Sequence, residues 1–142
     1  MRRYLVIANR TLCEQHLLDE VHRRRLADPG CRFHLIVPAS HPTGAFTDEQ
    51  CWGAAEERLA EALETFAVGG ISATGEVGDA DPVYAVGDVL LRELGRFDEL
   101  ILSTLPVGSS KWLAQNMVRR LRRSTGLPVT HVLAEVSATT SS

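Results

Sequence analysis

Five short apolar segments alternate along this chain with four longer segments whose apolar residues recur every three or four positions. The first pattern is typical of strands and the second of amphipathic helices. Residues 4–8 are apolar throughout, as expected for a strand covered on both faces of a sheet. Strict alternation of strands and helices predicts a parallel sheet with right-handed crossovers, which is an α/β fold. The predicted strands are residues 4–8, 32–37, 71–77, 100–102 and 129–133.

Capping residues mark the ends of the helical segments. Thr47 with Gln50 three positions later is a capping-box pattern, and paired glycines at 69–70 end that helix. Asp81 suits the N-cap of the next helix and Pro82 suits its first position. The four helices are therefore expected over about 12–26, from 47 to 69, from 82 to 95, and over about 110–124.

The apolar positions at helical spacing predict which side chains face the core. The segment 71–77 alternates with small polar residues, so we expect an edge strand there. The expected core-facing residues are Leu17, Leu18, Val21, Trp52, Ala55, Leu59, Ala62, Leu63, Phe66, Val83, Val86, Leu90 and Leu94.

The chain of 142 residues is long enough for one domain with a substantial core, expected over 1–136, with a disordered tail at 137–142. A net charge of −3 gives no case for nucleic-acid binding, and no apolar run is long enough to cross a membrane. The N-terminus lacks the pattern of a signal peptide. Three widely spaced cysteines, Cys13, Cys31 and Cys51, argue for reduced thiols. These features predict a cytoplasmic protein.

The stretch 99–111 is the clearest candidate for a binding site. Its apolar strand turns polar at Ser103 and Thr104, and the loop that follows contains Pro106 and Gly108. The next helix is expected to begin at Ser109-Ser110. A strand that opens through a glycine-containing loop onto a helix N-terminus is where open α/β sheets bind anions. An ordinary N-cap and turn is the alternative explanation.

Three features together resemble the universal stress protein (UspA-like) family over almost the whole chain. They are the five-strand α/β order, the turn 77–79 followed by Pro82 and Ala85, and the ending with an Arg-rich helix and the strand at 127–132. The variant is similar to an actinobacterial-type branch. The resemblance implies a three-layer open sandwich, with a five-stranded parallel sheet of order 3-2-1-4-5 and four helices. It places nucleotide above the carboxyl ends of strands one and four.

The sequence departs from the family where ATP-binding members carry G-x-x-G-x9-G-[ST]. Ser103, Pro106 and Asn116-Met117 stand in place of that motif and its three glycines. Glycine permits close backbone approach to phosphates, whereas proline removes an N–H donor. Asn9 replaces the family's usual Asp after the first strand and is a poorer partner for Mg²⁺. The resemblance with these departures implies a non-catalytic regulatory or stress-response domain in which ATP binding is lost or weakened.

A second hypothesis keeps an ATP or AMP site in a changed geometry, with weak binding. A third is an enzyme of the wider nucleotide-binding α/β group whose motif is not recognisable. The candidate nucleotide-binding residues are Ala8, Asn9, Val37, Gly78, Asp79, Ser103, Thr104, Gly108, Ser109 and Ser110.

Other constellations favour ordinary structural roles. Cys13 and His16 have the spacing of a metal-binding pair, but no second pair completes a tetrahedral site. A serine nucleophile is conceivable at Ser103, Ser109 or Ser110, but there is no nucleophile elbow and the sequence places no histidine to serve as a base. The basic clusters at 22–25 and 119–123 are expected to be solvated faces that complement helix C-termini, at the opposite end of the sheet from the loop.

The last strand is predicted to be an exposed, apolar edge. Such edges need protection, and pairing with a second copy supplies it. The resemblance also implies dimerisation through this strand. We therefore expect a homodimer, with no nucleic-acid or membrane partner and with any partner protein unidentified. The expected interface residues are Val129, His131, Val132 and Leu133.

Overall fold

The structure, a computed structural model, describes residues 2–8, 15–39, 48–79, 82–92, 97–104 and 110–133. All nine predicted elements are present in the predicted order. They are β1 (Arg3–Ile7), α1 (Gln15–Ala27), β2 (Arg32–Pro38), α2 (Asp48–Val68), β3 (Ala73–Gly78), α3 (Pro82–Arg92), β4 (Glu99–Thr104), α4 (Ser110–Thr125) and β5 (Val129–Leu133). The predicted tail at 137–142 and the helix caps Thr47 and Asp81 lie outside the described residues.

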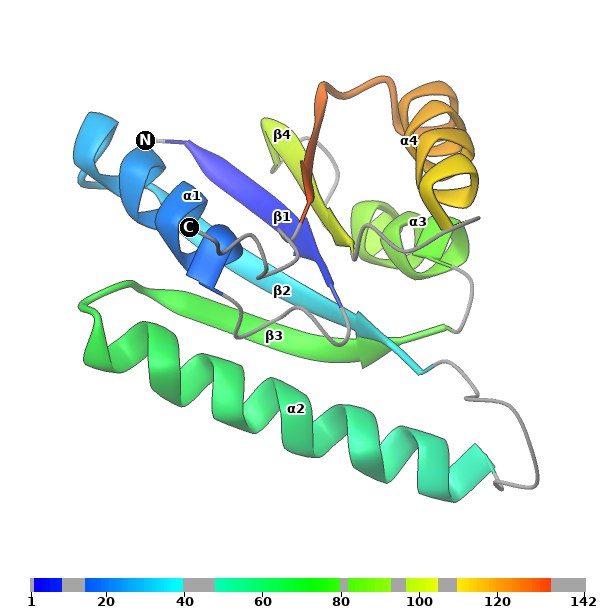
Figure 1. Cartoon of the computed structure of the whole chain (residues 1–142), viewed down its shortest axis with the longest axis horizontal. Coiled ribbons are helices and arrows are strands. Elements are labelled where there is room, and N and C mark those ends of the chain that lie inside the picture. Colours follow the sequence, from blue (N-terminus) through cyan, green and yellow to red (C-terminus); the bar gives the residue numbers. More distant parts are fainter. Residues whose placement is uncertain are drawn as a thin grey trace, which may run out of the picture.

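The five strands form one parallel sheet in the order β3-β2-β1-β4-β5, which confirms the predicted topology. Figure 1 shows β1 in the middle, with β2 and β3 on one side of it and β4 and β5 on the other. The edge position predicted for the third strand is correct, and β5 forms the opposite edge. β1 is central because both of its faces are apolar, so that it needs cover on both sides.

Two apolar cores lie on opposite faces of the sheet. Tyr4 and Val6 of β1 pack into one core with α1 and α2, whereas Leu5 and Ile7 pack into the other with α3 and α4. This division follows from the strand period of two, which sends successive side chains to opposite faces. Figure 1 shows α2 running along β3, while α3 and α4 lie together at the other side of the sheet.

A glycine-based cap ends α2. Gly70 has a positive φ of 78°. The N–H of Ile71 bonds to the Phe66 carbonyl at 2.9 Å, and the N–H of Gly70 bonds to the Ala67 carbonyl at 3.0 Å. This pair of bonds is a Schellman motif. It draws Ile71 into the core, so β3 begins at Ala73 rather than at residue 71 as predicted.

Most of the predicted core-facing side chains are buried or half-buried, but the prediction that Trp52 faces the core is wrong. Its side chain is 44% exposed. α2 spans 21 residues, or about 31 Å, whereas the six residues of β3 span about 20 Å. The first turns of α2 therefore extend beyond the strand that the helix covers.

In α3 the buried stripe is rotated from its predicted position. Ala85, Val86 and Val89 are buried, and Val83 and Leu90 only pack against the edge of the core. The predicted Leu94 lies outside the described residues. No helix of the described chain has both the length and the apolar character needed to cross a membrane.

Candidate functional site

The carboxyl ends of the central strands bring three of the predicted site residues together. Ile7 is in register with Ile36 of β2 and with Leu102 of β4. The next residues along these strands, Ala8, Val37 and Ser103, therefore lie at one edge of the sheet. All three are buried, and the N–H of Ala8 bonds to the Ile36 carbonyl at 3.2 Å.

Gly78 and Asp79 lie at the same edge, at the end of β3. A Cβ atom on Gly78 would lie 2.7 Å from Cβ of Ala85 and 3.3 Å from Cγ2 of Ile36. The absence of a side chain therefore lets α3 pack on β3, which is a structural role for this predicted site residue. Asp79 is exposed beyond it.

Two of the remaining predicted site residues, Thr104 and Ser110, lie at the same edge. Thr104 is the last residue of β4 and Ser110 is the first residue of α4, so the backbone places both at the carboxyl edge. Asn9, Gly108 and Ser109 lie outside the described residues. The described part of the site is therefore its floor, formed by the ends of the strands.

His16 is a site residue that the sequence analysis missed. Its Nε2 atom lies 3.2 Å from the Ser103 hydroxyl, 87 residues away in the chain. The sequence alone placed no histidine to serve as a base for this serine, and the structure brings His16 beside it. The signal was the position of His16 in the first turn of α1: the helix that follows β1 must begin at the carboxyl edge, where β4 also ends.

The side chains of His16 and Ser103 meet at the end of β4. Ser103 is only 4% exposed, and its hydroxyl is within hydrogen-bond distance of the imidazole. This serine stands where the family resemblance expects the first glycine of the phosphate loop. A side chain at this position keeps a ligand further from the backbone than glycine would.

Metal binding finds no support in the described residues. Among them, no three His, Cys, Asp or Glu side chains gather closely enough to hold a metal ion. Cys13 and Cys51 belong to the undescribed side chains, whereas Cys31 is buried as a free thiol whose pKa is raised by burial.

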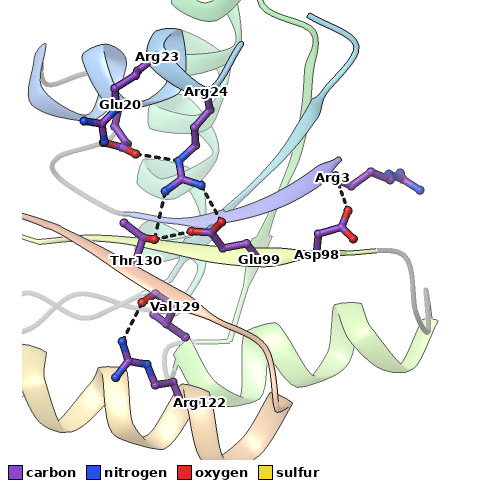
Figure 2. Close-up of polar contacts among 9 residues, drawn as sticks. All are labelled: Arg3, Glu20, Arg23, Arg24, Asp98, Glu99, Arg122, Val129 and Thr130. Atoms are coloured by element: carbon purple, nitrogen blue, oxygen red, sulfur yellow. Dashed lines mark hydrogen bonds and ion pairs between the residues drawn. The ribbon is translucent and has the colours of Figure 1, made fainter. Parts of the chain in front are cut away.

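The amino end of the sheet carries a buried ion-pair network (Figure 2). Arg24 of α1 donates to Glu20 at 2.8 Å, to Glu99 of β4 at 2.7 Å and to Thr130 of β5 at 3.1 Å. The Thr130 hydroxyl also donates to Glu99, and the Arg24 guanidinium lies 5.0 Å from the centre of the Tyr4 ring. We call Glu20, Arg24, Glu99 and Thr130 the amino-end network.

This network corrects the expectation that the 22–25 cluster is a solvated face. The Arg24 side chain is 16% exposed, whereas that of its neighbour Arg23 is 74% exposed. Hydrogen bonds from Arg23 and Arg24 outweigh burial and lower the pKa of Glu20. In the second cluster, Arg122 is also engaged, because it donates to the Val129 carbonyl at 3.1 Å.

Known structures with the same architecture are universal stress proteins. No protein-family model and no curated protein sequence matches the chain. One similar structure is the universal stress protein from Archaeoglobus fulgidus, with a TM-score of 0.57, 16% identity and 93% of each chain covered. Another, from Burkholderia pseudomallei, has a TM-score of 0.59 and 14% identity, with 91% of this chain and 93% of the other covered.

A third similar structure contains a nucleotide. It is a universal stress protein family member from Arabidopsis thaliana, solved with AMP bound. Its TM-score is 0.58 at 13% identity, and the match covers 99% of this chain and 97% of the other. At these identities the likeness concerns the fold, and it agrees with the five-stranded order found above. The chain has the fold of the universal stress proteins.

Proposed function

We propose that this chain is a non-catalytic regulatory or stress-response domain of the universal stress protein type, in which ATP binding is lost or much weakened. The fold supports the general assignment. The observation that carries the second part is Ser103, which is buried at the end of β4 and engaged with His16.

The reason is the geometry that a triphosphate needs. A phosphate chain is held by several backbone N–H groups that approach it closely, which glycines permit and bulkier residues hinder. Ser103 and Pro106 stand where the family resemblance expects glycines. Each removes part of that cradle, one by its side chain and the other by its missing N–H.

A second candidate function is the binding of AMP or ATP in a changed geometry. AMP carries a single phosphate and needs fewer hydrogen-bond donors than ATP does. The buried floor of Ala8 and Val37 and the exposed carboxylate of Asp79 offer apolar and polar surfaces at the same edge. The relative with bound AMP supports AMP as the ligand to test first.

Homodimerisation through β5 is part of the proposal. Val129 packs into the core on one face of the sheet and Val132 packs against the core on the other. The side chains of this edge strand are thus largely used within the subunit, and its outer row of backbone groups would pair with a second copy. Sedimentation velocity tests the assignment, and a monomer at micromolar concentration would contradict it.

Thermal-shift titration with ATP and AMP, on the wild-type chain and on Ser103→Gly, tests the nucleotide assignment. The wild-type chain is expected to show no shift with millimolar ATP. The glycine variant is expected to gain one, because it restores backbone access at the end of β4. A large shift with ATP in the wild-type chain alone would mean that Ser103 belongs to a working site.

A further inference from the structure

A pocket lies at the amino end of the sheet. It is on the face whose carboxyl half is covered by α3. Its volume is about 240 Å³. Leu5 and Ile36 pack in the same core as α3, which identifies the face of the sheet. Because side chains alternate along a strand, Arg3 of β1 and His34 of β2 lie on this face too. Arg32 and Thr74 share it and also line the pocket. α3 begins beside Gly78 and ends at Arg92, which bonds to Glu76 at 2.6 Å. The strand residues before Glu76 therefore line the pocket.

The described lining of the pocket is cationic. It includes two arginines, Arg3 and Arg32, and no carboxylate. Arg32 is exposed, and no described carboxylate lies within ion-pair distance of its guanidinium. The carboxylate of Asp98 accepts from the main-chain N–H of Arg3 at 2.9 Å, and Figure 2 shows the Arg3 guanidinium pointing away from it.

Contacts with neighbouring side chains hold two of the lining side chains in place. The Arg3 guanidinium lies 5.5 Å from the centre of the Phe97 ring. This contact with the ring fixes the position of the Arg3 side chain beside the pocket. His34 is fixed at both nitrogens, by Thr74 at 2.7 Å and by Glu76 at 3.1 Å. The pocket is thus preorganised.

The donors match a tetrahedral oxyanion. Guanidinium groups bind phosphate oxygens in pairs, and the hydroxyl of Ser72 lies on the same wall. Phe97 and Ala73 add an apolar surface beside these donors. The volume is below the roughly 300–1,000 Å³ of sites for drug-sized ligands. We propose that this pocket binds a small organic phosphate monoester through Arg3 and Arg32.

This site is separate from the candidate nucleotide site. Arg32 begins β2, whereas Val37 and Pro38 end it, so the two sites lie about 20 Å apart along the strand. The proposal therefore does not depend on whether the carboxyl edge binds nucleotide. In an NMR titration, chemical-shift changes at the amides of Ser72 and Thr74 would report binding in this pocket. Changes at the amides of Ala8 and Ser103 would report binding at the other site.

Amide NMR titration with phenyl phosphate and with inorganic phosphate at matched ionic strength tests the proposal. We expect saturable shifts at Arg32, Ser72 and Thr74, and tighter binding of the ester. Arg32→Gln is expected to weaken binding by about tenfold or more, because it removes a charged donor pair. Arg119→Gln removes the same charge from an exposed position on α4 and is the control.

The possible results separate cleanly. Saturation at the pocket that Arg32→Gln weakens and Arg119→Gln leaves unchanged supports the proposal. Chemical-shift changes that never saturate, or that decrease equally in the two variants, would mean that general surface charge attracts the phosphate. Either result would overturn the proposal. Tighter binding of inorganic phosphate than of the ester would overturn the assignment to a phosphate ester.

Discussion

The two ends of the sheet are built differently. At the amino end, the amino-end network joins α1 to β4 and β5 through a buried guanidinium with three partners. At the carboxyl end, the Ser103 hydroxyl lies 3.2 Å from Nε2 of His16. Polar groups at one end hold elements together, and those at the other end lie beside the loops where this fold binds ligands. We therefore expect the amino-end network to act mainly on stability and the carboxyl edge to act on the proposed nucleotide function, and variants at each end can test that division.

The largest expected effect is the loss of Arg24. Arg24→Met leaves the buried Glu99 and the half-buried Thr130 without their cation, and we expect it to lower the free energy of unfolding by about 2–4 kcal/mol. Urea unfolding measures this change. Arg23→Met removes an exposed arginine that pairs with the same Glu20, and it should leave the urea midpoint nearly unchanged. Equal losses from the two variants would contradict a special role for the amino-end network.

The second effect concerns Gly78 at the carboxyl end. Gly78→Ala places a methyl group 2.7 Å from Cβ of Ala85, and we expect a cost of about 1–3 kcal/mol from overpacking. Gly87→Ala is the matched control, because nothing lies within 4 Å of the added carbon and alanine favours a helix. The midpoint temperature of thermal unfolding should therefore fall for Gly78→Ala and rise for Gly87→Ala. A neutral Gly78→Ala would leave this glycine available for a role in ligand binding.

The third effect is a loss of stability in acid, in two steps. Burial lowers the pKa of His131, so its contribution is present above the ordinary value of 6.5 and is lost as the pH falls through the folded value. Glu20 and Glu76 also have lowered pKa values, and their contribution is lost only as the pH falls below 4.5. Urea midpoints across this range measure both steps. His131→Gln should remove the upper step alone, and an unchanged upper step would contradict the assignment.

The smallest effect is expected at the pair of His16 and Ser103. Ser103→Ala removes the partly buried hydrogen bond with His16, and such a bond is worth about 0.5–1.5 kcal/mol. His16→Ala should cost a similar amount, and the double variant should cost less than the sum of the two. A double-mutant cycle in urea measures this coupling. Strict additivity would show that the two side chains do not interact in solution.

The fold was predictable because its evidence is local. The apolar run at β1 and the helical spacing in α1 and α2 each arise from neighbouring residues, whose period reports the exposed face. Gly70 likewise predicted the end of α2 from the sequence alone. The strand order was expected from a resemblance rather than from the residues, and the structure confirms it.

The contacts at both ends were not predictable, since their partners lie far apart in the chain. Arg24 is separated from Glu99 by 75 residues and from Thr130 by 106, and His16 is separated from Ser103 by 87. A helix period shows that Arg24 lies near the end of α1, but not which strands begin beneath it. The burial of Trp52 was wrongly predicted for another reason. The spacing of apolar residues along a helix does not reveal where the strand beneath that helix ends.

Calorimetric titration of the wild-type chain with ATP, with and without Mg²⁺, tests the central claim most directly. The proposal that ATP binding is lost or weakened predicts no saturable heat at millimolar ATP, which corresponds to a binding free energy weaker than about −4 kcal/mol. Saturable binding with a micromolar Kd would contradict the account and show that the carboxyl end of this sheet retains a working nucleotide site.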